Sequence, residues 1–455
     1  MKKSVDFYSL AWRWHFYAGL FVAPFMILLS LTGIIYLFKP QLDPLMYRDL
    51  LQVQPAAQVL DADRQLARLR QVLPQASVSQ YLPPAGEGRS AQFVASLDGR
   101  ETNLFLDPYS GELLGRQDAK DNLQAIARAL HGELLLGTVG DRLVELAAGW
   151  GIVLVVSGVY LWWPRGRAKR GVLLPNREQR GRGWWRELHA VVGFWGALAL
   201  LFMLLTGMTW TGYWGQSFAD VWNRFPAAMW NEVPKSDVQA RELNQAHRQT
   251  VPWAVENTPM PISGAHAGHA GHAADGAAAA PQVSLQRVLD IARERGVAPG
   301  YSVTLPTTAE GVFTVAVFAD DPRRDATLHI DQYSGRVLAD IGWKDYGLVA
   351  RSVETGVMLH EGKMFGLANQ LLMLAVCLMI LFSAASGLWL WWLRKPAGRL
   401  GAPPLPHALP VWKVGLGIVL ALGVAFPLVG LSLLLVWGLD WLVLSRLGER
   451  RAALS

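Results

Sequence analysis

The chain has 455 residues, of which 52% are hydrophobic and only 17% are charged, and its formal net charge is +6. This composition excludes an ordinary soluble globular protein, because such proteins carry about 25% charged residues. The single cysteine, Cys377, excludes intramolecular disulfides, cysteine-held iron–sulfur clusters and covalent haem attachment through a C-x-x-C-H motif.

Long apolar runs predict the membrane spans, since about 20 apolar residues cross the bilayer core. In chain order we expect a cytoplasmic start with the first span over 1–39, a second span over 141–163, a third over 187–214 and a fourth over 367–394. The first run follows a basic start but is too long for a secretory signal and lacks a small-residue cleavage site. It is therefore predicted to be a retained anchor.

The loop 164–186 carries eight basic residues and one acidic residue, which predicts a cytoplasmic position. The N-terminus and the linker 395–410 then also face the cytoplasm, and the long segments 40–140 and 215–366 lie in the periplasm. We thus expect a multi-pass protein of the bacterial inner membrane. The positive charge is mostly explained by this topology, and no nucleic-acid partner is indicated.

The two outer segments resemble each other in sequence. LFLDPYSGELLG at 104–115 corresponds to LHIDQYSGRVLA at 328–339, each predicting a strand, a tight D-x-Y-S-G turn and a second strand. Amphipathic helices are expected upstream, over 60–73 and 284–295. Each outer segment is therefore predicted to be a small α+β domain. The second contains a His/Ala/Gly-rich insert, 263–281.

The last region, 411–455, contains an apolar stretch that is too long for one straight span and short for two. We expect either a fifth span formed by one long kinked helix or a tight hairpin near Pro427–Gly430. The predicted fold class is thus a membrane helical bundle with two inserted periplasmic α+β domains. It arises by tandem duplication of a helix–domain–helix unit, followed by the C-terminal hairpin or long helix.

Matched offsets support the duplication. Thr32-Gly33 lies 17 and 18 residues after His15, and Thr206-Gly207 lies equally far after His189. Ser157-Gly158 and Ser386-Gly387 each lie 26 and 27 residues after a histidine, His131 and His360. The phrases SGVYLWWPR (157–165) and SGLWLWWLR (386–394) end these matches, and we interpret their tryptophans and arginine as cytoplasmic-side anchors.

This combination of LH-x-x-x-x-x-G segments, D-x-Y-S-G turns and SG-x-x-LWW helix ends resembles the PepSY-associated transmembrane family to about residue 394. That family includes inner-membrane siderophore-iron reductases. The resemblance implies PepSY-like outer domains and a ferric siderophore, or another periplasmic metal chelate, as the substrate whose iron is released as Fe(II).

The four matched histidines predict a cofactor. Approximate two-fold symmetry brings His15 towards His189 at the cytoplasmic level, and His131 towards His360 at the outer level. Facing imidazoles at two levels suit two non-covalent b-type haems with bis-histidine ligation. Gly19 and Gly193, one turn after the inner histidines, would clear room for a porphyrin, and Arg13 and Arg186 could meet its propionates.

Alternatives stay open. The histidines could be interfacial hydrogen-bonding residues, and if only one pair binds haem we expect the inner pair. The protein could also be a non-redox accessory or transport component for metal chelates, or a PepSY-type regulatory module. No G-x-G-x-x-G fingerprint or flavin motif is present, so the electron donor would be a quinol or a separate flavin reductase. No catalytic residue is predicted.

Six further histidines have no counterpart in the other half. His266, His269 and His272 in the insert could bind a metal ion weakly, although an ordinary flexible linker explains them as well. The other three, His247, His329 and His407, are interpreted as surface or core residues.

Overall fold

The computed structural model describes residues 7–165, 172–223, 230, 232–244, 249–264, 282–396, 401 and 412–439. The chain forms two compact units, and each is described by itself. We call residues 1–34, 130–217 and 372–455 the membrane unit, and residues 35–129 and 218–371 the sheet unit.

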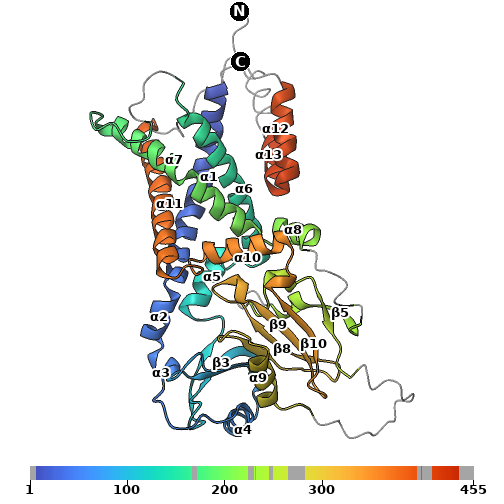
Figure 1. The fold of residues 1–455 in the computed structure, drawn as a ribbon. Helices are drawn as coiled ribbons and strands as arrows, with labels where there is room; N and C mark the ends of the chain where they lie inside the picture. The colour runs from blue at the N-terminus through green and yellow to red at the C-terminus, as the bar shows by residue number, and fades with distance from the viewer. Residues whose placement is uncertain are drawn as a thin grey trace, which may run out of the picture. The chain divides into compact units, whose positions relative to one another are not determined.

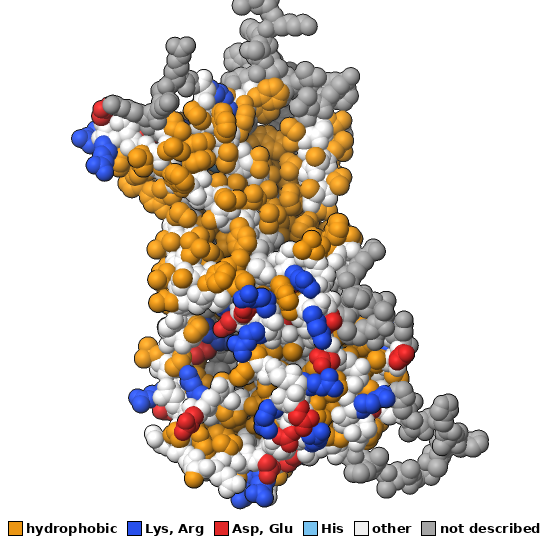
Figure 2. All heavy atoms as spheres, in the orientation of Figure 1, with side chains coloured by type: hydrophobic (Ala, Val, Ile, Leu, Met, Phe, Trp, Pro, Cys, Tyr) orange, Lys and Arg blue, Asp and Glu red, His pale blue; other side chains and the backbone are white. Residues whose placement is uncertain are grey.

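Four helices of the described residues are long and apolar enough to cross a bilayer: α1 (Phe7–Leu37), α6 (Thr138–Trp162), α7 (Gly181–Met208) and α11 (Leu367–Arg394). At 1.5 Å per residue they extend roughly 37 to 47 Å, more than the ~30 Å of the hydrocarbon core. Figure 2 shows hydrophobic side chains gathered over the long helices and charged side chains gathered over the strands. The chain is therefore a membrane protein.

The C-terminal apolar stretch forms two helices, α12 (Trp412–Ala425) and α13 (Pro427–Leu439), so the chain has the hairpin rather than one long helix. They pack closely where Gly423 meets Gly430, since a Cβ added to Gly430 would lie 2.6 Å from the Gly423 Cα. Each helix extends only about 20 Å, which is less than the bilayer core.

The hairpin is fixed to the rest of the membrane unit by two indole N–H groups. Trp150 on α6 donates to the Ser432 hydroxyl at 3.0 Å. Trp214 donates to the carbonyl of Ala425, the last residue of α12, at 2.9 Å. The tip of the hairpin is therefore held by α6 and by the segment that follows α7.

The sheet unit is built on one eight-stranded antiparallel sheet with the strand order β10-β9-β8-β7-β1-β2-β3-β4 (Figure 1). Its strands are β1 (Ser77–Leu82), β2 (Ala91–Leu97), β3 (Arg100–Leu106), β4 (Leu113–Asp118), β7 (Ser302–Thr304), β8 (Val312–Val317), β9 (Ala326–Asp331) and β10 (Val337–Gly342). A separate two-stranded sheet pairs β5 (Lys235–Gln239) with β6 (Pro259–Pro261).

The two outer segments are joined through β1 and β7. Gln80 pairs with Thr304 and Tyr81 with Val303, and the Gln80 amide also donates to the Thr304 hydroxyl at 3.1 Å. The sequence predicts an α+β domain in each segment, and the structure has both sets of strands in one continuous sheet. Each set of four strands thereby covers one open edge of the other.

Two amphipathic helices cover one face of this sheet, α4 (Ala62–Val72) and α9 (Leu285–Glu294) (Figure 1). The side chains of Asp61 and Ser284 cap them by accepting from the N–H of Arg64 and Arg287. Leu69 and Val288, fully buried, meet the sheet in one apolar core. Both helices were predicted from their apolar periodicity, and both are confirmed.

The opposite face carries a second core, which includes residues of α10 (Leu348–His360), the 3-10 turn η3 (Trp253–Val255) and strands β8 and β10. The remaining helices are α2 (Lys39–Met46), α3 (Arg48–Leu51), α5 (Leu123–Glu133) and α8 (Trp214–Trp222). Short 3-10 turns lie at η2 (Ala240–Leu243), η4 (Pro322–Arg324) and η5 (Trp343–Asp345).

The D-x-Y-S-G turns have the predicted conformation. Asp107 accepts from the N–H of Tyr109 at 2.8 Å, and Asp331 accepts from the N–H of Tyr333 at 2.9 Å. Gly111 and Gly335 have φ values of 76° and 70°, which a side chain would strain. The aspartate and the glycine of the motif therefore fix these two turns.

Candidate functional site

Two of the four matched histidines lie together in the membrane unit. His15 is on α1 and His189 is on α7, and their ring centroids are 6.4 Å apart with the ring planes at 77°. Two imidazoles that bind one metal from opposite sides through bonds of about 2 Å would place their ring centres about 6 Å apart. The spacing therefore fits a shared metal centre.

Each of these histidines is held by the serine of an S-G pair. The Nδ1 of His15 lies 3.1 Å from the Ser157 hydroxyl on α6. The Nδ1 of His189 lies 2.9 Å from the Ser386 hydroxyl on α11. The two serines that mark the repeated phrases thus contact the two histidines directly, and they do so from a different helix in each case.

The hydrogen bonds of the serine hydroxyls favour one tautomer of each histidine. Ser157 donates to the carbonyl of Leu154 at 3.1 Å, and Ser386 donates to the carbonyl of Ser383 at 3.2 Å. A hydroxyl has one proton to donate, so each serine oxygen is left to accept from the histidine Nδ1–H. This tautomer leaves the Nε2 lone pair available, and metal-binding histidines commonly use this arrangement.

The glycine after each serine makes room for the imidazole. A Cβ added to Gly158 would lie 3.0 Å from the Cε1 of His15, and one added to Gly387 would lie 3.3 Å from the Cε1 of His189. Both distances are shorter than ordinary carbon–carbon contacts of about 3.5–4.0 Å. In each S-G pair, the serine therefore contacts the imidazole ring and the glycine leaves space for it.

His131 makes a similar hydroxyl contact with the threonine of a T-G pair, whose glycine is at an ordinary contact distance. Its Nδ1 lies 3.1 Å from the Thr32 hydroxyl, which donates to the carbonyl of Leu28 at 2.8 Å. A Cβ added to Gly33 would lie 3.5 Å from its Cε1. Thr32 is 17 residues beyond His15 on α1, about 26 Å along the helix. The membrane unit thus contains histidines with hydroxyl partners at two levels.

His360 is the last residue of α10 and belongs to the sheet unit, so the predicted pairing of His131 with His360 stays a prediction. His131 lies on α5, which is likewise a separate helix before the span α6. The matched glycines Gly137 and Gly366 both have φ of 57° immediately before α6 and α11. The repeated spacing after His131 and His360 therefore includes a turn between two helices.

The glycines predicted to clear a porphyrin differ in surroundings. A Cβ added to Gly193 would have no atom within 4 Å, whereas one at Gly19 would lie 3.6 Å from the Leu154 Cδ1. An apolar hollow of about 370 Å³ opens beside Ser386 and is lined by Trp185, Phe382, Ala385 and Trp389. Open space and apolar side chains therefore lie next to residues that neighbour or contact His189.

The predicted propionate partners lie near the pair in sequence. Arg186 is exposed on α7, and the guanidinium of Arg13 lies 5.5 Å from the ring of Tyr17. Arg394, the last residue of SGLWLWWLR, lies over the rings of Trp12 and Phe16 on α1, at 4.8 and 5.0 Å. Arg394 is therefore a third cation, which contacts the residues of α1 on both sides of His15, and the sequence predicts only an anchor role for it.

Within the described residues, no group of three or more His, Cys, Asp or Glu side chains is arranged to hold a metal ion. The donor set of the candidate site is two neutral imidazoles in an apolar bundle. Such a set fits a haem iron, whose other ligands come from the porphyrin. The three insert histidines, His266, His269 and His272, lie outside the described residues.

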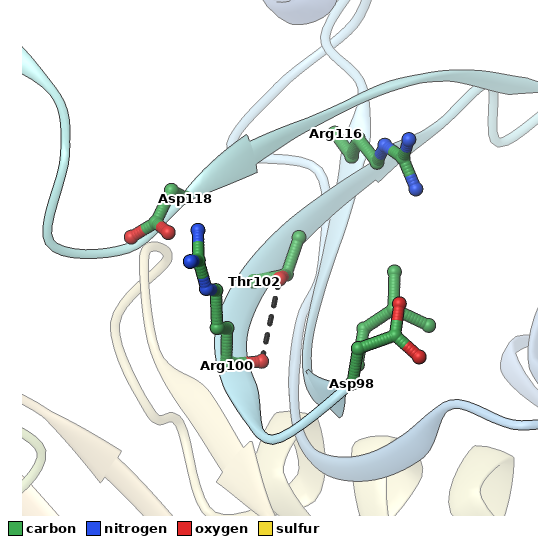
Figure 3. Close-up of a pocket in the computed structure, with 6 residues that line it drawn as sticks. Asp98, Arg100, Thr102, Arg116 and Asp118 are labelled. Atoms are coloured by element: carbon green, nitrogen blue, oxygen red, sulfur yellow. Dashed lines mark hydrogen bonds between the residues drawn. The ribbon is translucent and has the colours of Figure 1, made fainter.

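A second hollow, of about 620 Å³, lies on the sheet unit at the ends of β2, β3 and β4 (Figure 3). Arg100, Arg116, Asp98 and Asp118 line it, and Figure 3 shows the Arg100 side chain on the same side as Asp118. Two positive and two negative groups give it no net charge. It therefore does not select an anionic chelate by charge.

Comparison with known proteins adds one finding. The family model described as the PepSY-associated TM region matches residues 12–394. No curated protein matches the chain at a significant level. The matched range begins within α1, includes α6, α7, α11 and both sets of strands, and ends at the last arginine of SGLWLWWLR. The chain therefore belongs to the PepSY-associated transmembrane family.

Proposed function

We propose that this protein is a haem b reductase of the bacterial inner membrane, which passes electrons to a ferric siderophore in the periplasm and releases Fe(II) for uptake. One observation carries the proposal. The ring centroids of His15 and His189 lie 6.4 Å apart, a spacing that fits two imidazoles on one iron, and each Nδ1 lies within hydrogen-bond distance of a serine hydroxyl.

The protein's own groups have defined roles in this proposal. His15 and His189 would bind the haem iron through Nε2, and Ser157 and Ser386 would keep each ring in the required tautomer. The apolar helices would exclude water from the site. A bound haem supplies reversible one-electron oxidation and reduction of its iron, and the axial ligands and their hydrogen bonds set its potential.

A second haem at the outer level would extend the path across the bilayer. Support comes from the contact of His131 with Thr32, because Thr32 lies about 26 Å along α1 from His15. The sequence repeat gives His360 as the second ligand. The haem content of the purified protein decides whether one haem is bound or two.

The direction of electron flow follows from the proposed topology. The basic loop 164–186 favours a cytoplasmic inner level, and the strand-containing segments would then face the periplasm. A ferric siderophore is a suitable acceptor, because oxygen chelators hold Fe(II) less tightly than Fe(III) and release it on reduction. The donor is proposed to be a membrane quinol or a separate flavin reductase.

The test of this function is a single-turnover reaction. The dithionite-reduced protein, freed of excess reductant, is mixed with a ferric siderophore, and Fe(II) is measured with a ferrous chelator while the haem spectrum is followed. We expect one Fe(II) for each haem oxidised. Haem that stays reduced would contradict the reductase proposal and would favour a non-redox accessory or regulatory role.

A further inference from the structure

A group of buried polar atoms lies under α10 in the sheet unit. Six side-chain atoms of this region are buried without a hydrogen-bond partner among the described residues: Trp230 Nε1, Asp325 Oδ2, Thr327 Oγ1, His329 Nε2, Tyr346 Oη and Glu354 Oε2. All six residues are at most 4% exposed. Buried polar atoms normally have partners, so this group requires an explanation.

Strand geometry brings these groups to one place. Thr327 and His329 alternate along β9 and therefore point to the same face of the sheet, and Asp325 immediately precedes the strand. Their intervening neighbour Leu328 belongs to the core beneath α4 and α9 on the other face. Glu354 comes from α10, which packs over the first face, and the segments preceding Asp325 and Tyr346 contact each other.

Each carboxyl group has one bound oxygen and one unpartnered oxygen. Glu354 accepts the Ala254 N–H at 2.9 Å through Oε1, and Asp325 accepts the Ala319 N–H at 2.8 Å through Oδ1. The other oxygen of each remains without a protein partner among the described residues. Two buried carboxyl groups and a buried phenol thus share one region.

The charges that act on this region are acidic. Those that act on Glu354 belong to Asp325, Glu256 and Glu361, and those that act on Tyr346 belong to Asp325, Glu354 and Asp345. Asp321 also acts on Asp325. Burial raises the pKa of Asp325 to about 8 and raises the pKa of Glu354 well above its usual range. Both carboxyl groups therefore stay neutral to higher pH than exposed carboxyl groups do.

We propose that Asp325, Tyr346 and Glu354 form a buried site for internal water molecules and exchangeable protons, which holds α10 against the sheet only while Glu354 is neutral. Water suits the site because an internal water makes two to four hydrogen bonds to otherwise unsatisfied polar groups. Loss of the Glu354 proton would place a charge among acidic groups in the core. The cost of burying this charge would weaken the packing of α10 on the sheet, even though the carboxylate still accepts the Ala254 N–H.

The sign of the pH dependence follows from the raised pKa values. An acid whose pKa is higher in the folded state stabilises the fold most below its unfolded value, about 4 for Asp and Glu. The contribution is lost as the pH rises through the folded pKa. The sheet unit should therefore become less stable from about pH 6 to about pH 9.

The experiment compares thermal unfolding of the full-length protein in lipid nanodiscs at these two pH values. We expect the midpoint of the wild type to fall by about 5 °C or more towards the higher pH. E354Q and D325N should lose at least half of this shift, because a side-chain amide still accepts the backbone N–H but cannot ionise. Glu112→Gln, an exposed position on the same unit, is the matched control and should leave the shift unchanged.

Infrared spectroscopy provides a second readout that needs no unfolding. The C=O stretch of a buried protonated carboxyl group should be present at neutral pH, should weaken in E354Q and should shift in D₂O. A midpoint with no pH dependence in the wild type, or a carboxyl band that is unchanged in both E354Q and D325N, would overturn the proposal. If E354Q fails to fold, D325N alone is compared with the wild type in both the unfolding and the infrared experiment.

Discussion

The Nδ1 of His189 lies 2.9 Å from the Ser386 hydroxyl, and Ser386 donates its own proton to the carbonyl of Ser383. Removal of this hydroxyl takes away the side-chain partner that orients the imidazole. We therefore predict that S386A weakens haem binding by about 10–100-fold, as found for partners of metal-binding histidines. The measurement is a haem titration of the apoprotein followed by absorbance.

The matched control for S386A is Ser383→Ala. Ser383 lies one turn earlier on the same helix and offers only its backbone carbonyl, which the substitution keeps. S383A should bind haem as the wild type does. Equal affinity for haem in S386A and S383A would contradict the role assigned to the Ser386 hydroxyl.

Gly158 and Gly387 give a second prediction. Alanine at an interior helix position normally stabilises the helix by up to about 1 kcal/mol relative to glycine. At Gly158, however, the new Cβ would lie 3.0 Å from the Cε1 of His15, and at Gly387 it would lie 3.3 Å from that of His189. Both variants should fold and bind haem less tightly, and G158A should show the larger loss in the same titration.

Gly196 is a suitable reference for these variants, because an added Cβ there makes only ordinary contacts with Met379 at 3.9 Å. G196A should retain haem affinity. If G158A and G196A bind haem alike, the glycine of the S-G pair has no role in admitting the ring.

The joined sheet is testable by cysteine pairing. Gln80 and Thr304 are directly opposite each other on the antiparallel strands β1 and β7, and such pairs have Cα separations of about 4.5–5.5 Å, within the range of a disulfide. With the single native cysteine replaced by alanine, Q80C/T304C should therefore form a disulfide under mild oxidation. Mass spectrometry of the linked peptides detects it.

The offset pair Q80C/S302C serves as the control, because Ser302 lies two residues before Thr304 on β7 and is not opposite Gln80. Linkage in the offset pair but not in Q80C/T304C would show that the register of β1 and β7 is different.

Asp331 gives a prediction for acid pH. Burial alone would raise its pKa, but the N–H groups of Ser334, Gly264 and Tyr333 and the Ser334 hydroxyl outweigh burial and lower the pKa. The stability from this turn is therefore present above about pH 4 and is lost as the pH falls through the lower folded value. D331N should cost about 1–3 kcal/mol near neutral pH, measured by urea unfolding.

Removal of the carboxylate should also remove its acid transition. D331N should lose less stability than the wild type as the pH falls below about 4. An identical acid dependence in the two proteins would exclude Asp331 as the group that titrates.

Local patterns in the sequence account for much of this architecture. Apolar length predicts the spans, 3.6-residue periodicity predicts α4 and α9, and the D-x-Y-S-G motif predicts turns in which Asp107 and Asp331 accept backbone N–H groups. These features depend on residues that are neighbours in the chain. The pairing of β1 with β7 depends on residues more than 200 positions apart, and no local pattern specifies it.

The candidate site likewise combines features that the sequence pattern predicts with contacts that it does not predict. The matched offsets single out His15 and His189, and the structure places their rings 6.4 Å apart. They also single out Ser157 and Ser386, but by their spacing from His131 and His360 and not as partners of His15 and His189. An offset between a histidine and a serine on another helix gives no contact by itself. The buried groups around Asp325 and Glu354 were missed because single acidic residues in a segment resemble exposed ones.

The central claim is that His15 and His189 bind one haem. The most direct measurement is the optical spectrum of the purified protein, oxidised and dithionite-reduced, for the wild type, H15A, H189A and the control H247A, whose position has no counterpart in the other half. We predict a reduced b-type α-band in the wild type and in H247A, with the inner-site haem lost in H15A and in H189A. A colourless wild-type protein from haem-replete cells, or full haem content in both H15A and H189A, would contradict it.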